Sequence, residues 1–428
     1  MTEVCDIIIV GAGAAGLTAG IAAGQFARQA QVTLRIVLLD AARRFAGKIL
    51  VAGGGRCNLT HDPVRPEDFN GSRNIVRNVL AGFDASATMQ WLESLGVPLI
   101  REEDGKVFPA GQSGRAVLDA LVRECGQVGA TIRPQCRVRE ISPDPPCGDS
   151  PSATPCTVRH EWGELKGRRI VLCTGGASMP ATGTTGQGWD LARQLGHTVT
   201  DVHPALVPLL LQDGFFHAEM AGLTHEAELS AFVDGKRVDR RTGSMLWTHF
   251  GISGPVVLDI SRHWTTARAA GGKVELRCNF LPGESFEQVE RWLTDQAASP
   301  HRRIDSVLAS RLPRRLAERI ARTCHIGADV RAGRLRREDR RQLVHALTQL
   351  PLPVVGDRGW KHAEVTAGGV PLQEIDYRTM ESRKCPGLHL AGEMLDCDGR
   401  VGGFNLQWAW STGHLAGRAA ARSLLRPV

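Results

Sequence analysis

A glycine-rich turn near the start of the chain sets the strongest limit on its fold. Residues 5–11 form an apolar, β-branched segment that ends at the first glycine of Gly11-Ala-Gly13-Ala-Ala-Gly16. Residues 14–29 then have the composition of a helix, and the apolar segment 32–40 ends at Asp40. A buried strand, a glycine turn, a helix and a second strand in this order predict a βαβ unit.

Each glycine of this turn has a chemical reason. Gly11 allows a tight turn, Gly13 lets the backbone approach a pyrophosphate, and Gly16 lets the helix pack close to the strand. The helix N-terminus offers unpaired N–H groups and partial positive charge to phosphates. The Asp40 carboxylate can accept both ribose hydroxyls of an adenosine. The motif therefore predicts a bound dinucleotide, without distinguishing FAD from NAD.

Three further segments favour the longer of these cofactors. Residues 47–58, GKILVAGGGRCN, combine glycines with several polar side chains, and Thr174-Gly175-Gly176 ends another apolar strand. Gly392-Glu393, Asp396 and the glycines at 402–403 precede a closing helix predicted over 403–425. A second acidic strand end and a second glycine-rich helix start suit a cofactor with a polyol and a ring system, which is FAD.

The order of predicted elements indicates a domain with insertions. Short strands over 131–176, with a proline-rich surface loop at 143–155, continue the α/β pattern, and this pattern returns from residue 363. Between them lie short strand-like segments over 201–280 and helical periodicity over 283–350. We therefore expect a discontinuous α/β domain (1–200 and 356–428), a β-rich insertion (201–282 and 342–355) and a basic helical insertion (283–341).

Composition excludes several protein classes. The 428 residues include no apolar run near the roughly 18 that a membrane helix needs. Asp6 interrupts the apolar start, and no basic segment precedes it, which argues against an export signal. Eleven cysteines without CxxC pairs fit reduced thiols better than disulfides or zinc ligands. We expect a cytoplasmic protein with no membrane contact and no metal.

Positive charge is concentrated in one segment. Residues 301–341 hold thirteen Arg, no Lys and five acids, a net charge of +8, whereas the whole chain carries +7. Such a segment is either a solvated helical face or a surface that follows nucleic-acid phosphates.

The sequence resembles a known family of bacterial flavoproteins, the HI0933-like or YhiN-like proteins. The resemblance rests on blocks spread over residues 5 to about 418, among them GKILVAGGGRCNLTH, CTGGASMPATGTTGQGWDLARQLGH, LWTHFGISGPVVLDIS, AEVTAGGV and GGFNLQWAWSTGHLAG. It implies an α/β fold: a two-dinucleotide-binding-type, Rossmann-like FAD domain interrupted by a β-barrel-like insertion and a small helical insertion.

The resemblance also implies roles for single residues. The adenylate and pyrophosphate would be held by Gly11, Gly13, Ala14, Ala15, Asp40, Val138 and Gly175. The flavin would be approached by Lys48, Arg56, Cys57 and Asn58. The pyrophosphate, ribityl chain and flavin N1–O2 edge would be met by Glu393, Asp396, Gly403, Phe404 and Asn405. A helix N-terminus at that edge would stabilise a reduced, anionic flavin.

Members of this family are associated with three reactions, which the sequence leaves open. These are reduction of activated double bonds in small molecules, amine oxidation, and reduction of a uridine in 23S ribosomal RNA to dihydrouridine. The basic segment favours the RNA substrate, since a small-molecule enzyme has no need of it. A flavin-binding protein without turnover is a further alternative. NAD(P)H is the expected transient electron donor, because GTTGQG at 183–188 lacks the strand that a second Rossmann unit needs.

Reduction of a carbon–carbon double bond also needs a proton donor. The candidate catalytic residues are Cys57, His249 and Ser253. A buried cysteine is more often a small hydrophobic residue, which is the alternative for Cys57, and the alternative for His249 is a hydrogen-bonded structural histidine.

Overall fold

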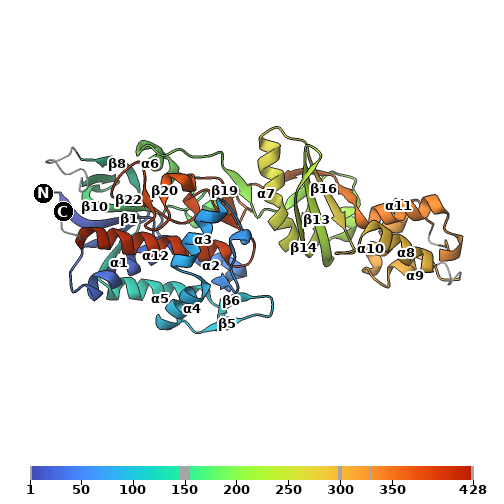
Figure 1. Ribbon diagram of the computed structural model, residues 1–428, viewed down its shortest axis with the longest axis horizontal. Coiled ribbons are helices and arrows are strands. Elements are labelled where there is room, and N and C mark those ends of the chain that lie inside the picture. Colours follow the sequence, from blue (N-terminus) through green and yellow to red (C-terminus); the bar gives the residue numbers. More distant parts are fainter. Residues whose placement is uncertain (1, 145–154, 297–300, 328, 426–428) are drawn as a thin grey trace. The chain divides into compact units, whose positions relative to one another are not determined.

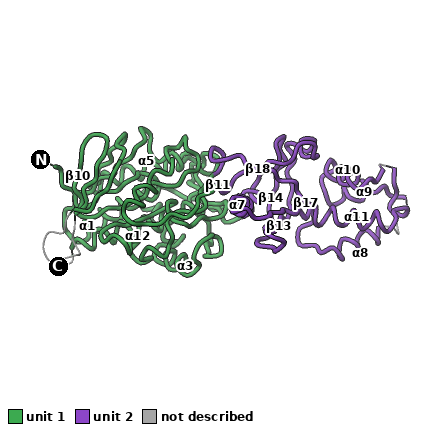
Figure 2. The backbone as a smooth tube through the Cα atoms, turned by 90° about the horizontal axis from the view of Figure 1, so that it is seen from above, with its two compact units in different colours: residues 1–203, 364–428 green, residues 204–363 purple. Residues whose placement is uncertain are grey.

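The computed structural model describes residues 2–144, 155–296, 301–327 and 329–425. Most of the predicted proline-rich loop therefore lies outside the described residues. The chain divides into two compact units: unit 1 comprises residues 1–203 and 364–428, and unit 2 comprises residues 204–363 (Figure 2). The three-part division expected from the sequence stays a prediction.

Unit 1 is built on a nine-stranded sheet in the order β20-β21-β22-β10-β1-β2-β7, with β9 paired to β10 and β8 to β9. Its parallel centre consists of β1 (Glu3–Val10), β2 (Ile36–Leu39), β7 (Ala130–Arg133), β10 (Gly163–Leu172) and β22 (Leu388–Leu390). The antiparallel strands are β8 (Val138–Pro143), β9 (Cys156–His160), β20 (Ile375–Asp376) and β21 (Glu381–Ser382). The predicted α/β, Rossmann-type fold is confirmed.

Two long helices lie side by side along this sheet, α1 (Ala14–Gln29) and α12 (Phe404–Leu425) (Figure 1). A Cβ atom at Gly413 would overlap the carbonyl oxygen of Ala15, and one at Gly417 would overlap that of Ala19. The two glycines, four residues apart, therefore form a flat stripe that lets the helix backbones touch. The predicted segments 14–29 and 403–425 correspond to these helices.

The chain between β2 and β7 forms an accessory layer of unit 1. It contains α2 (Gly47–Val51), α3 (Arg73–Gly82), α4 (Ala85–Ser94) and α5 (Gly114–Gln127). A three-stranded antiparallel sheet joins β3 (Thr60–His61), β6 (Lys106–Pro109) and β5 (Leu99–Arg101). β4 (Phe69–Asn70) pairs with β23 (Asp398–Gly399), which brings this layer to the segment just before α12.

A buried polar cluster fastens the end of α6 (Gly188–Gln194) to the sheet edge. The imidazole of His197 lies 2.7 Å from Glu374 and 2.8 Å from the Ser382 hydroxyl. Burial raises the pKa of Glu374, but hydrogen bonds from Lys384, Thr198 and His197 outweigh it and lower that pKa to about 2. The cluster is satisfied within the protein, so we assign it to the fold.

Unit 2 contains a seven-stranded antiparallel sheet in the order β17-β16-β13-β14-β15-β12-β18. Its strands are β12 (Leu209–Leu211), β13 (Thr224–Val233), β14 (Lys236–Thr248), β15 (Gly251–Ser253), β16 (Val274–Asn279), β17 (Leu350–Leu352) and β18 (Val354–Asp357). Its helices are α7 (Pro255–Ala269), α8 (Phe286–Gln296), α9 (Ile304–Leu308), α10 (Arg314–Thr323) and α11 (Arg337–Thr348). Sheet and helices share one apolar core, which includes Trp247, Phe280 and Leu316.

Helix α7 departs from the strand-like character expected over 201–280. Pro255 occupies its first turn, where a missing N–H costs nothing, and Val256, Val257, Ile260 and Trp264 form a buried stripe at helical spacing. The short glycine-bounded segments around it concealed this periodicity.

The cysteines within the described residues are all buried. None of the described helices has the length and apolarity to cross a bilayer. The described residues also contain no group of three or more His, Cys, Asp or Glu side chains placed to hold a metal ion.

Candidate active site

The glycines of the turn after β1 differ in their surroundings: two are required by close packing, and one borders open space. Gly11 has a φ of +104°, and its N–H donates to the Leu39 carbonyl over 2.8 Å. A Cβ atom at Gly11 would overlap the Cys173 carbonyl oxygen, and one at Gly16 would overlap the carbonyl of Gly11. A Cβ at Gly13 would meet no atom of the described residues within 4 Å. Gly13 is thus not needed for packing, and open space lies in front of it.

The first turn of α1 and Asp40 border this space. Gly13 is the N-cap of α1 and has no side chain to cap the N–H groups that follow, those of Ala14 and Ala15 among them. The Asp40 carboxylate accepts the N–H of Ala12 over 2.7 Å and that of Ala42 over 2.8 Å. Burial raises the pKa of Asp40, and these two bonds act against the rise. Asp40 therefore holds the glycine turn, and each oxygen keeps a lone pair for another donor.

Thr174 lies beside the same turn through its backbone. Its Cα lies 3.1 Å from where a Gly11 Cβ would stand, whereas its Oγ1 is buried against Gly188 of α6 and has no hydrogen-bond partner within the described chain. The next residue, Gly175, has a φ of +75°. Val138, the half-buried first residue of β8, was predicted for the same side of the cofactor. Sequence analysis selected this segment for its glycines and missed the threonine hydroxyl.

Lys48 and Glu393 are brought together, and they bind each other. Lys48 Nζ lies 2.5 Å from Glu393 Oε2 and 2.6 Å from Ser178 Oγ. Glu393 Oε1 accepts from Ser178 Oγ over 2.9 Å and from the Thr366 N–H over 3.0 Å. The half-buried Asp396 follows three residues later. Sequence analysis missed Ser178 and Thr366, because nothing in their spacing relates them to Lys48.

Arg56 is paired within the protein but stays 36% exposed, whereas Cys57 is buried. Arg56 forms an ion pair with Glu102 and lies over the Phe108 ring, 3.9 Å from its centroid. Cys57 is 0% exposed, and burial raises the pKa of its thiol to about 12. A thiol with that pKa stays protonated at neutral pH, but no exposed face connects it to a substrate. This environment is typical of a packing cysteine.

The N-terminus of α12 is held by three predicted residues. Gly403 has a φ of +93°, and the Asn58 amide bonds both its N–H (3.3 Å) and the Thr60 carbonyl (2.9 Å). Asn405 donates to the Gly399 carbonyl over 2.9 Å and accepts the Gly399 N–H over 2.8 Å.

Phe404, the first residue of α12, stacks on an imidazole that sequence analysis did not select. The centroids of the Phe404 and His61 rings lie 4.7 Å apart. His61 Nδ1 lies 3.2 Å from the Gly402 carbonyl, and burial lowers the pKa of His61. His61 is the final residue of the segment GKILVAGGGRCNLTH, which was the available sequence signal.

The other two proton-donor candidates share one hairpin of unit 2. His249 follows β14, is exposed, and meets the Phe250 ring edge-on with centroids 5.1 Å apart. Ser253 ends β15, is half-buried, and pairs with Leu246 across the sheet. Cys57 belongs to the other unit.

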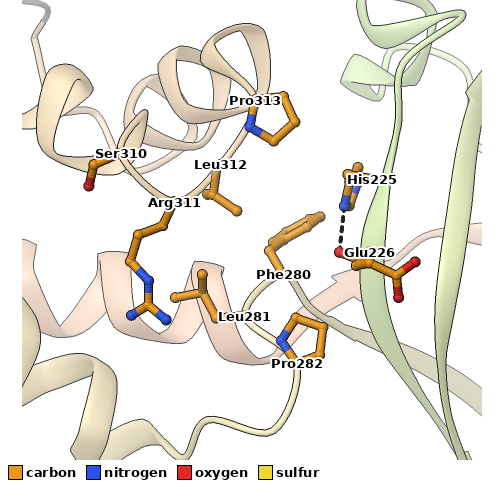
Figure 3. A pocket seen from close by; sticks show the side chains of 9 residues that line it. All are labelled: His225, Glu226, Phe280, Leu281, Pro282, Ser310, Arg311, Leu312 and Pro313. Carbon is orange, nitrogen blue, oxygen red and sulfur yellow. Dashed lines mark hydrogen bonds between the residues drawn. The ribbon is translucent and has the colours of Figure 1, made fainter.

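A cavity of about 380 Å³ also lies in unit 2. Figure 3 shows its lining, which comes from β13, from the loop after β16 and from the loop between α9 and α10: His225, Glu226, Phe280, Leu281, Pro282, Ser310, Arg311, Leu312 and Pro313. None of these is a predicted site residue. Phe280 and Leu312 are buried, so the cavity offers little apolar surface to a ligand.

A protein-family model, described as the HI0933-like protein Rossmann domain, matches residues 5–419. The chain belongs to the HI0933-like family. This confirms the resemblance on which the residue roles rest, and with it the enzyme class, an FAD-dependent oxidoreductase.

The chain matches two curated relatives over almost their full length. It is 34% identical to a 3-dehydro-bile acid delta(4,6)-reductase of Clostridium scindens over 96% of this chain and 98% of that protein. It is 33% identical to the ribosomal RNA dihydrouridine synthase of Escherichia coli over 95% of this chain and 96% of that protein. A quinol–fumarate reductase structure shares the fold at 18% identity and a TM-score of 0.50, over 99% of this chain and 71% of that chain.

The residues present fit an FAD molecule. The open space before Gly13, the N–H groups of the first turn of α1 and the Asp40 carboxylate all border one glycine turn. They offer N–H donors to phosphates and a carboxylate to a ribose. The second glycine-rich helix start, at Gly403, lies in the same unit.

Proposed function

We propose that this enzyme reduces a uridine of 23S ribosomal RNA to dihydrouridine, with NAD(P)H as the electron source. The observation that carries the proposal is the net charge of +8 within residues 301–341, in a chain 33% identical to a ribosomal RNA dihydrouridine synthase. Clustered arginine accelerates and strengthens encounters with folded RNA, whereas a small-molecule reductase gains nothing from it.

FAD, when bound, supplies the hydride chemistry. The chain's own residues bind and orient it. We propose that the first turn of α1 and Asp40 hold the pyrophosphate and a ribose, and that the N-terminus of α12 faces the ring system. The proposed contact set is Gly11, Gly13, Ala14, Ala15, Asp40, Lys48, Arg56, Asn58, Val138, Gly175, Glu393, Asp396, Gly403, Phe404 and Asn405. Lys48 and Glu393 would act as a fixed ion pair, since each already satisfies the other.

Saturating the uracil C5–C6 bond adds one hydride to one carbon and one proton to the other. Among the three proton-donor candidates we propose His249, because its imidazole is exposed whereas Cys57 is fully buried. His249→Asn should lower kcat and remove an ionisation from the pH–rate profile, whereas Ser253→Ala should leave that ionisation in place. An unchanged profile for His249→Asn would exclude this histidine as the donor.

A second candidate function has support of its own. The 34% identity to a bile acid reductase is as high as the identity to the RNA-modifying relative. Reduction of an activated C=C bond in a small molecule therefore stays the alternative, together with amine oxidation. Turnover of such a substrate would be insensitive to salt, whereas turnover on RNA falls steeply as salt rises.

Mass spectrometry of 23S ribosomal RNA from a deletion strain tests the proposal. Dihydrouridine is two hydrogens heavier than uridine, so one fragment should become lighter by two hydrogens when the gene is lost. Complementation with the intact gene should restore the heavier fragment. Identical fragment masses in the parent and deletion strains would refute the RNA substrate.

A further inference from the structure

The arginines of residues 301–341 fall into two groups in the structure. One group is neutralised by carboxylates of the same unit, in the pairs Arg303–Asp305, Arg311–Glu284, Arg314–Glu318, Arg319–Glu219 and Arg336–Asp339. The other group has no carboxylate within ion-pair distance in the described chain. The sequence alone does not distinguish the arginines of one group from those of the other.

Arginines of α10 serve the packing of unit 2. Arg319 lies 3.5 Å from the Glu219 carboxylate and over the Phe216 ring, 5.4 Å from its centroid. Arg315 donates to the Glu219 carbonyl oxygen. Both side chains thereby fasten α10 to the 3₁₀ turn Phe216–Met220. These arginines are engaged and are poor candidates for an external phosphate.

Backbone hydrogen bonds bring some arginines of the second group, those without a carboxylate partner, close together. The N–H of Ala332 donates to the Arg302 carbonyl over 2.8 Å, and the N–H of Ile304 donates to the Val330 carbonyl over 2.9 Å. Arg331 Nη1 lies 3.3 Å from His301 Nδ1, so these two side chains are neighbours. The segment that carries Arg302 therefore runs beside the one that carries Arg331.

The chain continues from there into more unpaired arginines. Arg334 ends a 3₁₀ turn, and Arg337 and Arg341 lie one turn apart on α11, hence on one face. We call the exposed set the arginine patch: Arg302, Arg331, Arg334, Arg337 and Arg341.

The acidic residues near the arginine patch do not neutralise its positive charge. Over residues 301–305 and 329–341, eight arginines face four acids, a net charge of +4. Arg303 takes both oxygens of Asp305, and Arg336 takes both oxygens of Asp339. Of these four acids, the exposed Asp329 and Glu338 have no arginine partner among the described residues.

We propose that the arginine patch is the surface that docks folded RNA through its phosphates. This inference rests on the proposed function and narrows the RNA contact to five exposed arginines of unit 2. A guanidinium stays charged at all physiological pH values and can bind a phosphate through two parallel N–H bonds. Because the patch arginines hold no carboxylate, phosphate binding breaks no existing ion pair.

Filter binding of the full-length, FAD-loaded protein to protein-free 23S ribosomal RNA, over a series of NaCl concentrations, tests the patch. The test variant combines Arg334→Gln, Arg337→Gln and Arg341→Gln. It should bind about tenfold or more weakly near physiological salt. Its slope of log K against log salt should shrink by about 2, since each lost phosphate contact removes roughly 0.7–0.9.

A matched control removes the same number of charges from paired positions: Arg303→Gln, Arg314→Gln and Arg336→Gln. It should weaken binding less than about threefold and leave the salt slope unchanged, because these guanidiniums already hold carboxylates. Flavin absorbance per chain and the melting temperature, measured on both variants, check that the protein has folded.

Three outcomes decide the inference. A loss confined to the patch variant supports it. An equal loss in both variants would mean that only net charge matters, and no loss in either would mean that RNA binds elsewhere; both overturn the patch. Loss of dihydrouridine in the deletion strain, fully restored by the patch variant, would refute the patch and leave the proposed function standing. Unchanged RNA in the deletion strain would refute the proposed function instead.

Discussion

An alanine at Gly13 should separate cofactor binding from folding. The added methyl group would meet no atom of the described residues within 4 Å, and the φ of −79° at Gly13 is one that alanine adopts readily. Alanine caps a helix less well than glycine but restricts the unfolded chain, and these effects nearly cancel. The free energy of unfolding of the FAD-free Gly13→Ala protein should therefore change by less than about 1 kcal/mol.

Cofactor affinity should respond strongly to the same change. If a pyrophosphate fills the space before Gly13, the methyl group must displace it, which costs about 1–3 kcal/mol by analogy with overpacked cores. This corresponds to a roughly fivefold to 150-fold weaker Kd for FAD. Titration of apoprotein with FAD, followed by flavin fluorescence, gives the Kd, and urea unfolding gives the stability.

Two other glycines provide controls. Gly126→Ala, in α5, also adds a methyl group in open space and should leave the Kd unchanged. Gly16→Ala would overlap the Gly11 carbonyl and should destabilise the protein itself. If Gly13→Ala bound FAD as tightly as the parent, the glycine turn would not hold the pyrophosphate, and the placement argued here would be wrong.

Three further perturbations test other parts of the structure. Gly417→Ala pushes a methyl group into the Ala19 carbonyl, so thermal unfolding should show a loss of about 1–3 kcal/mol; an unchanged melting temperature would contradict the close packing of α1 and α12. Lys48→Met leaves the Glu393 carboxylate without its cation and should lower the free energy of unfolding in urea by about 1–3 kcal/mol. The double variant Lys48→Met with Glu393→Gln should recover part of this loss. If the losses of the two single variants simply add in the double variant, Lys48 and Glu393 are not coupled. The pKa of Glu374 in the folded protein, about 2, lies below the ordinary 4.5. The stabilisation by its carboxylate is therefore complete above pH 4.5 and is lost as the pH falls toward 2. Glu374→Gln should flatten this part of the curve of stability against pH, and an unchanged curve would contradict the buried cluster.

Local patterns predicted the core of unit 1 well, because its elements follow from short segments. The β1–α1–β2 unit and the closing helix α12 appear where apolar periodicity and glycine placement require them. The helices of the accessory layer, α3 to α5, received no assignment, although each has a buried apolar stripe.

Side-chain partners were less predictable than the elements that carry them. Glycine spacing located Asp40 and Gly403, but nothing local relates Lys48 to Glu393, which lie 345 positions apart. The same holds for Arg56, whose partner Glu102 comes from a separate hairpin. Sequence gives the chemical type of a residue, whereas its partner depends on which distant segments the sheet brings together.

The cofactor claim is tested most directly by the protein as purified. Its absorption spectrum and the FAD released on denaturation should show an oxidised flavin at about one molecule per chain, or the same value after incubation with FAD. A protein that stays colourless after such incubation, and retains no FAD on gel filtration, would contradict the account.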